Sequence, residues 1–226
     1  MRKNKYIFLA IFILVGLGVF LGAENARAAV AGDVIINEIM WGGSNASDTD
    51  EWIELRNITA SAINLQGLTL KNVIAGNATL TINIAFSSTT TIPASGYFLI
   101  GNASSASSSI VNSVTVRSAT DTISLIDSYL INGPIILRDN LNNLIDQTPA
   151  STTTNWPAGA IGVATSSMAR DWTVGTGTST TDWHSAVFAT NWDAGAPEKG
   201  TPGVYNGYSI SGTFSQLNAN ASGTVY

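Results

Sequence analysis

Residues 34–70 read VIINEIMWGGSNASDTDEWIELRNITASAINLQGLTL, and this stretch decides the fold. Apolar residues dominate 34–41, an acidic turn follows at 45–51, and a second strand-like run begins at Trp52. Short apolar runs of this kind, bounded by turn-forming residues, predict β-strands joined by loops. The stretch therefore predicts two neighbouring strands that carry acidic residues, Glu38 on the first and Glu54 on the second.

The rest of the chain continues the β pattern. Apolar residues alternate with polar or small ones at Leu80, Ile82, Ile84 and Phe86, which predicts a strand with one buried face. Turn-forming residues separate such runs at 75–77, 94–96, 132–134 and 139–140, and no segment after residue 28 keeps a helical spacing. Short strands with frequent turns predict an all-β, two-sheet sandwich.

Short motifs follow one another in a recognisable order. After Asn37-Glu38 and Glu51–Asn57 come IPASGYFLI at 92–100, GPIILRD at 133–139, LID at 144–146, SSMAR at 166–170, DWH at 182–184 and GTPGVYN at 200–206. This order resembles the lamin tail domain, in the form that bacteria place on secreted and cell-surface proteins. The resemblance implies an immunoglobulin-like β-sandwich. Ala169 departs from the pattern, because the family would place an acid beside the arginine, so no ion pair is carried over to this position.

The alternation of residues around Trp52 does not show which face of its strand is buried. Strict alternation would place Trp52, Glu54 and Arg56 on one face of their strand and Ile53 and Leu55 on the other. Periodicity does not say which face is inside. The family resemblance implies that both faces are covered near Trp52, so we expect this ring to be buried.

The first 28 residues have the form of a secretory signal helix. Basic residues at 2, 3 and 5 precede an apolar run from Tyr6 to Ala23, and Ala26-Arg27-Ala28 is a small-x-small cleavage site. Cleavage would place the protein outside the cell or on its surface. An uncleaved membrane anchor is the alternative, since a span needs about 20 apolar residues. We expect the sandwich domain at 29–206, and at 207–226 a linker or the start of a further β module.

The remaining chain is acidic. Residues 1–28 hold four of the ten bases and one of the fifteen acids, so the rest carries six bases, fourteen acids and a net charge of −8. Its bases are scattered singly, which does not favour binding to nucleic acid or to an anionic membrane. Cysteine is absent and histidine occurs once, which excludes thiol catalysis and zinc sites rich in cysteine or histidine.

Catalytic candidates are few. His184 is the single histidine and would be the general base of a Ser-His-Asp triad, but the sequence has no Gly-x-Ser-x-Gly elbow and places no acid beside it. Glu38 and Glu54 could face each other as the carboxylate pair of a glycoside hydrolase. We favour a structural role for all three residues, and predict that the domain is not an enzyme.

Asp48, Asp50 and Glu51 in the acidic turn are the candidate metal ligands. Oxygen atoms from two aspartates two residues apart could converge on Ca²⁺. The turn lacks the spaced glycine and the distal glutamate of an EF-hand loop. We favour a solvated, charged turn and predict no cofactor, with Ca²⁺ as the alternative.

Residues 151–201 are rich in Gly, Ser, Thr and Trp and lack clean alternation. We interpret them as a long connection that is fixed to the sandwich by Trp156, Trp172, Trp183 and Trp192, since an indole ring covers a large apolar area. Exposed rings that stack on sugars are the alternative.

The sequence therefore predicts an exported, non-catalytic module for adhesion or protein–protein interaction in a larger surface protein, with an unknown protein or surface polymer as partner. Two alternatives stay open. The module could be an accessory domain of an extracellular hydrolase such as a nuclease or phosphatase, or it could bind carbohydrate.

Overall fold

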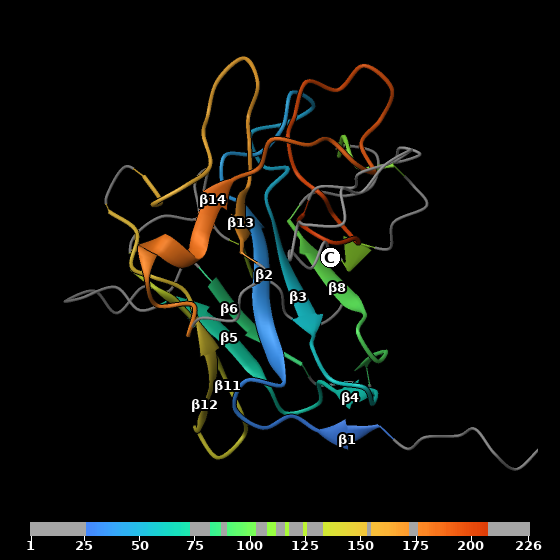
Figure 1. Ribbon diagram of the computed structural model, residues 1–226, viewed down its shortest axis with the longest axis vertical. Helices are drawn as coiled ribbons and strands as arrows, with labels where there is room; N and C mark the ends of the chain where they lie inside the picture. Colours follow the sequence, from blue (N-terminus) through green and yellow to red (C-terminus); the bar gives the residue numbers. More distant parts are fainter. Residues whose placement is uncertain are drawn as a thin grey trace, which may run out of the picture.

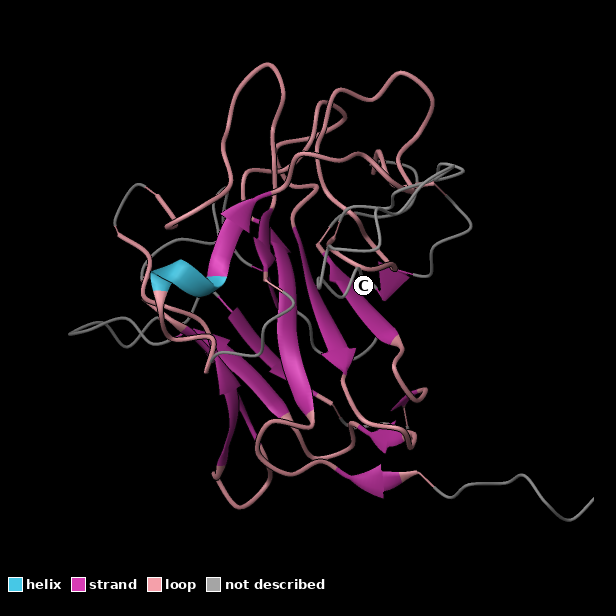
Figure 2. Cartoon of the chain, viewed as in Figure 1, coloured by secondary structure: helices cyan, strands magenta, loops and turns pink. Residues whose placement is uncertain are grey.

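The computed structural model describes residues 26–72, 82–86, 90–102, 108–111, 116–117, 124–125, 133–152, 155–171 and 176–207. These residues form β-strands and one short 3-10 helix, Thr180–Asp182, which confirms the all-β prediction (Figure 2). No helix within these ranges is long and apolar enough to cross a membrane. The predicted signal helix lies outside the described residues.

The first sheet has six strands in the order β14-β13-β2-β3-β8-β9. In that order they span Trp183–Ser185, Met168–Arg170, Val34–Met40, Trp52–Asn57, Tyr97–Gly101 and Val116–Arg117. All neighbours are antiparallel except β8 and β9, which are parallel. The central pair β2–β3 is the hairpin that residues 34–70 predicted.

The second sheet has five antiparallel strands in the order β10-β6-β5-β11-β12. They span Ser124–Leu125, Ile82–Ala85, Thr69–Asn72, Ile135–Arg138 and Leu144–Gln147. A small third sheet joins β1 (Arg27–Ala28), β4 (Ile63–Asn64) and β7 (Thr91–Ile92) at the end of the molecule that lies lowest in Figure 1.

The main core lies between the two large sheets. The first sheet contributes Ile36, Ile53 and Leu55, and the second contributes Leu70 and Leu137, all without exposed surface. Burial of apolar area of this kind is the dominant favourable term in folding. The two facing layers are visible in Figure 1, with β2 and β3 in front of β5 and β6.

A β-bulge in β2 places two adjacent polar side chains on the outer face of the first sheet. Ile36 pairs with Leu55 and Glu38 pairs with Glu54, so Asn37 is the extra residue. An extra residue in one strand interrupts the alternation of side chains. Ile36 belongs to the main core, whereas the Asn37 and Glu38 side chains both make their hydrogen bonds on the opposite face.

A second, smaller apolar cluster covers this outer face. Met40, Trp52 and Leu99 from the sheet pack with Ile110 and Trp192 from the loops above it. The ring centres of Trp52 and Trp192 are 6.3 Å apart, and Trp52 has no exposed surface. Trp52 is therefore buried, as the resemblance implied, with the sheet on one side and the long connection on the other.

The connection at 151–201 is fixed to the sandwich largely as predicted. Its indole rings at 156, 183 and 192 are buried, with 5%, 6% and 9% of their surface exposed. Trp183 Nε1 donates to the carbonyl of Gly177, and Trp192 Nε1 donates to that of Gly200. Trp172 lies outside the described residues.

The N-terminal strand β1 includes the last two residues of the predicted signal segment. Arg27 pairs with Ile63 in the small sheet, and its guanidinium contacts the Asp33 carboxylate at 2.5 and 2.9 Å. Cleavage after Ala28 would remove this strand and this ion pair, so the site of processing decides whether the small sheet keeps β1.

Candidate functional site

A row of polar side chains crosses the outer face of the first sheet. His184 on β14 pairs with Ala169 on β13, Ala169 pairs with Glu38 on β2, and Glu38 pairs with Glu54 on β3. Residues that pair across neighbouring strands share a face of the sheet. The small Ala169 is thus the only side chain between His184 and Glu38 in this row, and the two glutamates are direct neighbours as the sequence suggested.

Both glutamates are fully buried, and residues 200–206 lie against them. Glu38 Oε1 accepts hydrogen bonds from Ser167 Oγ at 2.5 Å and from the Thr201 backbone at 2.9 Å, and its Oε2 accepts from Thr201 Oγ1 at 2.8 Å. Glu54 accepts from Asn37 Nδ2 at 2.7 Å and from the backbone of Gly203 at 2.5 Å. The two carboxylates therefore hold the 200–206 segment against the sheet.

Asn206 closes the same network. Its Nδ2 donates to the carbonyl of Asn37 at 2.8 Å, and its Oδ1 accepts from Asn37 Nδ2 at 2.8 Å. A buried polar network is stable only when its members are satisfied. The GTPGVYN motif at 200–206 supplies the required donors through Thr201, Gly203 and Asn206.

Burial changes the acidity of this pair. The pKa of Glu54 is well above its ordinary range, because burial disfavours the charged form and the negative charge of Glu38 disfavours it further. Burial also raises the pKa of Glu38, and hydrogen bonds from Ser167 and Thr201 oppose that rise. The pair is thus poised to hold a proton. It is closed to substrate by the segment above it, which does not favour glycoside hydrolysis.

His184 has an acid partner that the sequence analysis did not anticipate. Its Nδ1 lies 2.5 Å from Asp171 Oδ1, and both side chains are about 40% exposed. Antiparallel pairing of β13 with β14 brings residues 171 and 184 together, and sequence spacing does not show this pairing. Within the described part of the chain, no serine hydroxyl is hydrogen-bonded to His184, so the dyad lacks the nucleophile of a triad.

The three candidate metal ligands lie in different environments. Asp48 is exposed at the tip of its turn, whereas Asp50 is buried and its Oδ2 accepts from the Ser109 backbone at 2.8 Å. Glu51 is fully buried at the start of β3. Across the described ranges, no group of three or more histidines or acids is arranged to hold a metal ion. Asp50 instead fastens the loop at 108–111 to the turn.

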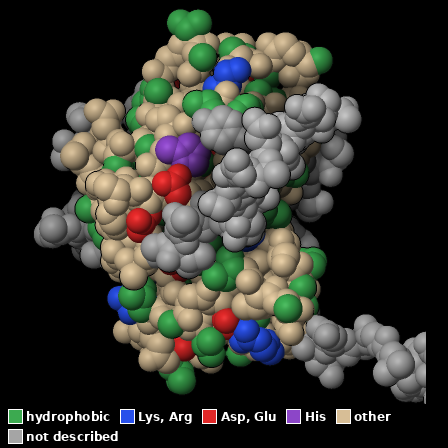
Figure 3. All heavy atoms as spheres, viewed as in Figure 1, with side chains coloured by type: hydrophobic (Ala, Val, Ile, Leu, Met, Phe, Trp, Pro, Cys, Tyr) green, Lys and Arg blue, Asp and Glu red, His purple; other side chains and the backbone are tan. Residues whose placement is uncertain are grey.

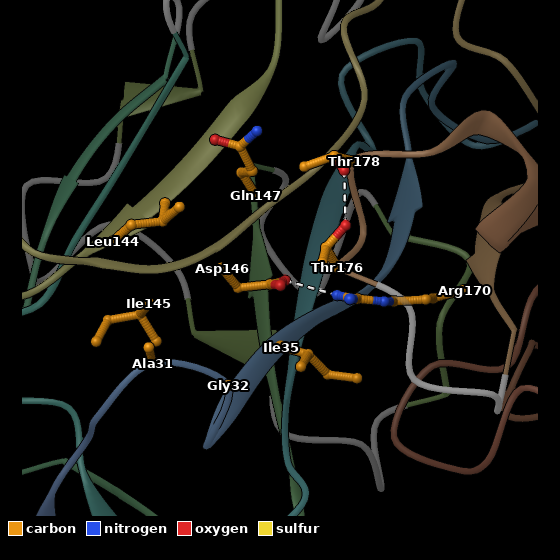
Figure 4. A pocket seen from close by; sticks show the side chains of 10 residues that line it. All are labelled: Ala31, Gly32, Ile35, Leu144, Ile145, Asp146, Gln147, Arg170, Thr176 and Thr178. Atoms are coloured by element: carbon orange, nitrogen blue, oxygen red, sulfur yellow. Dashed lines mark hydrogen bonds and ion pairs between the residues drawn. The ribbon is translucent and has the colours of Figure 1, made fainter.

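A pocket of about 370 Å³ lies where the two sheets separate, next to β12 and β2 (Figure 4). Its floor holds a buried ion pair, in which Arg170 donates to Asp146 at 2.7 Å across the gap between the sheets. Asp146 also accepts from the backbone of Ile36, at the part of β2 that β13 does not reach. Figure 4 shows Thr176 and Thr178 beside the pair and Leu144 on the opposite wall.

Burial raises the pKa of Asp146 to about 6, although the positive charge of Arg170 opposes this. This ion pair was not among the residues expected from the sequence. A signal was available, since Asp146 and Arg170 are charges of opposite sign, each inside a short apolar strand segment. Such residues are rarely buried unless they are paired.

Comparison with known protein families identifies the family of the chain. Among curated proteins, none matches the sequence. A family model described as Lamin Tail Domain matches residues 27–152, which is more than half of the chain. This match covers both large sheets except β13 and β14, and includes the bulge and both glutamates. The chain therefore belongs to the lamin tail domain family and has its immunoglobulin-like fold.

Proposed function

We propose that the chain is an exported, non-catalytic module that binds another protein through one projecting loop. The family is of the immunoglobulin-like type that serves protein interaction. Immunoglobulin-like sandwiches carry recognition on loops at one end. The observation that supports the proposal is a loop at residues 159–166, exposed at 160–164 and apolar there, which we name the apolar hairpin.

The apolar hairpin has a fixed base. Ala160 and Ser166 exchange two backbone hydrogen bonds of 2.9 Å, and Gly159 N donates to Ser185 Oγ at 2.8 Å. Gly159 has φ +82°, and a Cβ atom there would collide with the indole nitrogen of Trp41. Only glycine fits such a position without strain. The loop therefore starts from a rigid point instead of a flexible linker.

The tip of the apolar hairpin is hydrophobic. Val163 is 97% exposed and Ile161 is 47% exposed, and residues 160–164 carry no charge. Ile161 rests on Gly42, because a Cβ atom at Gly42 would lie 2.7 Å from Ile161 Cγ1. Hydrophobic side chains are visible at the corresponding end of the molecule, at the top of Figure 3. Apolar side chains held out in this way suit an apolar recess on a partner protein.

The expected contribution of Val163 to the free energy of binding is modest and measurable. Burying an exposed valine contributes about 1.5 kcal/mol, which is roughly tenfold in affinity.

Sugar stacking has less support, because the five tryptophans in the described ranges are all at most 9% exposed.

A photo-crosslinking side chain at position 163, in cells that produce the protein, tests the proposal. Leu141 is the matched control, since it is 77% exposed in the turn between β11 and β12. We expect a defined protein adduct from position 163 and none from 141. Val163→Asp should then weaken binding of the captured protein about tenfold or more, and Leu141→Asp should change it less than about twofold. Equal adducts from both positions, or equal effects of both substitutions, would refute the assignment.

A further inference from the structure

The Glu38–Glu54 pair is hydrogen-bonded mainly to the segment that covers it. Three of the five hydrogen bonds that the two carboxylates accept within the described structure come from residues 201 and 203, and the other two come from Ser167 and Asn37. The pair and the segment above it therefore open or stay closed together. In the closed state the two carboxylates are in register and fully buried. Two like charges in that arrangement destabilise it.

We propose that residues 200–206 form a proton-controlled latch, which is closed while the Glu38–Glu54 pair holds a proton and loosens when both side chains are ionised. Opening lets water reach both carboxylates, and each then behaves as an ordinary glutamic acid. The latch also reaches the outer apolar cluster, since Trp192 Nε1 donates to the Gly200 carbonyl at 2.9 Å. Loosening therefore disturbs the cover over Trp52.

The sign of the effect follows from linkage. Burial raises the pKa of both glutamates in the closed state, so closing takes up a proton. Closing is then favoured at low pH, and this advantage is lost as pH rises from about 4.3, the ordinary value for glutamate, through the raised values. If one proton is released on opening, the opening constant should rise about tenfold per pH unit in that window.

Other titratable groups face the pair from the surrounding elements. His184 on β14 acts on Glu38, and Arg56 on β3 acts on Glu54. Both are bases whose positive charge lowers the pKa of the glutamate they act on. Tyr97 on β8 ionises only at high pH, because burial raises its pKa above the ordinary value, and Tyr205 on the latch acts on Tyr97. A positive charge on His184 favours ionised Glu38 and therefore opposes the effect, so it cannot produce the predicted direction.

Hydrogen exchange of the Thr201 and Gly203 amides in the full chain measures the opening directly, because each amide donates to one of the carboxylates. After correction for base-catalysed exchange, we expect their opening constants to rise by up to about tenfold per pH unit as pH increases above the ordinary pKa range of glutamate. Amides of Ile53 and Leu55 in β3 should stay flat. Glu54→Gln should abolish the rise at 201 and 203.

Glu198→Gln is the matched control. Glu198 is 1% exposed and precedes the same segment, but its carboxylate accepts from the backbone of Asn45 and lies outside the pair. The Glu198→Gln protein should keep the full pH dependence. A flat profile in the unsubstituted chain, or a retained slope in Glu54→Gln, would overturn the proposal.

A second measurement applies if Glu54→Gln does not fold. Carbon-detected titration of the side-chain carboxyl groups in the unsubstituted protein reports the protonation of Glu54 directly. A carboxyl signal of Glu54 that titrates well above the range of exposed glutamates supports the latch. Titration of both Glu38 and Glu54 in the ordinary range overturns it.

Discussion

Trp52→Ala should destabilise the domain by about 3 kcal/mol, the lower end of the cost of deleting a large buried aromatic. The ring is fully buried against Met40 and Leu99 on the sheet and Trp192 above it. The sheet side of the resulting cavity cannot collapse, whereas the loops that carry Ile110 and Trp192 can relax and fill part of it. For a domain of this size, the loss corresponds to a fall in Tm of about 6 to 12 °C.

Trp52→Phe separates packing from hydrogen bonding. Trp52 Nε1 is buried and has no hydrogen-bond partner within the described structure, so phenylalanine keeps much of the ring area and removes an unsatisfied donor. We expect a change within about 1 kcal/mol. Urea denaturation followed by circular dichroism gives both values, with Leu141→Ala as a surface control. An unchanged midpoint for Trp52→Ala would refute the burial of this ring and reopen ligand stacking.

Three further predictions concern separate sites. Arg170→Met should destabilise the fold by about 3 to 5 kcal/mol at pH 7, because it leaves Asp146 as a lone buried charge. The loss should shrink at pH 5, which is below the Asp146 pKa of about 6 in the unsubstituted protein, because a protonated Asp146 no longer needs the charge of Arg170; an equal loss at both pH values would contradict this. Intact-mass analysis of the exported protein should find Ala29 as the first residue, and Met1 retained in membrane fractions would favour the anchor. Thermal melts in millimolar Ca²⁺ and Mg²⁺ should differ little, also in the Asp48→Asn, Asp50→Asn protein; a Ca²⁺-selective shift lost on substitution would establish a metal site at this turn.

The sequence predicted the sandwich and the facing glutamates because both depend on local pattern. Residues 34–57 form one hairpin, and the pairing of its two strands follows from their closeness in the sequence and from the apolar pattern. The bulge was also visible in principle, since Asn37 and Glu38 are adjacent polar residues inside an apolar strand. The apolar pattern predicted strands here but not the bulge.

Contacts between distant, irregular segments were not predictable in the same way. Asp171 and His184 meet through the pairing of two three-residue strands, and Asp50 meets Ser109 across 59 positions of sequence. Neither strand has a clear alternation, and loop contacts leave no periodic signal. The apolar hairpin was missed for the same reason, since residues 159–166 are glycine- and alanine-rich and alternate poorly.

The same irregular segments complete the domain. The family model ends at residue 152, yet beyond it β13 and β14 extend the first sheet, the latch covers Glu38 and Glu54, and Trp192 packs on Trp52. Without them, two buried carboxylates and an apolar cluster would face water. We therefore expect residues 155–206 to fold with the sandwich as one cooperative unit.

Unfolding of two proteins, one comprising residues 26–206 and the other residues 26–152, tests this claim most directly. Differential scanning calorimetry should show a single cooperative transition for the longer protein and no comparable transition for the shorter one. Equal transition midpoints and enthalpies for the two proteins would contradict the account, because they would show that the outer layer contributes nothing to the stability of the sandwich.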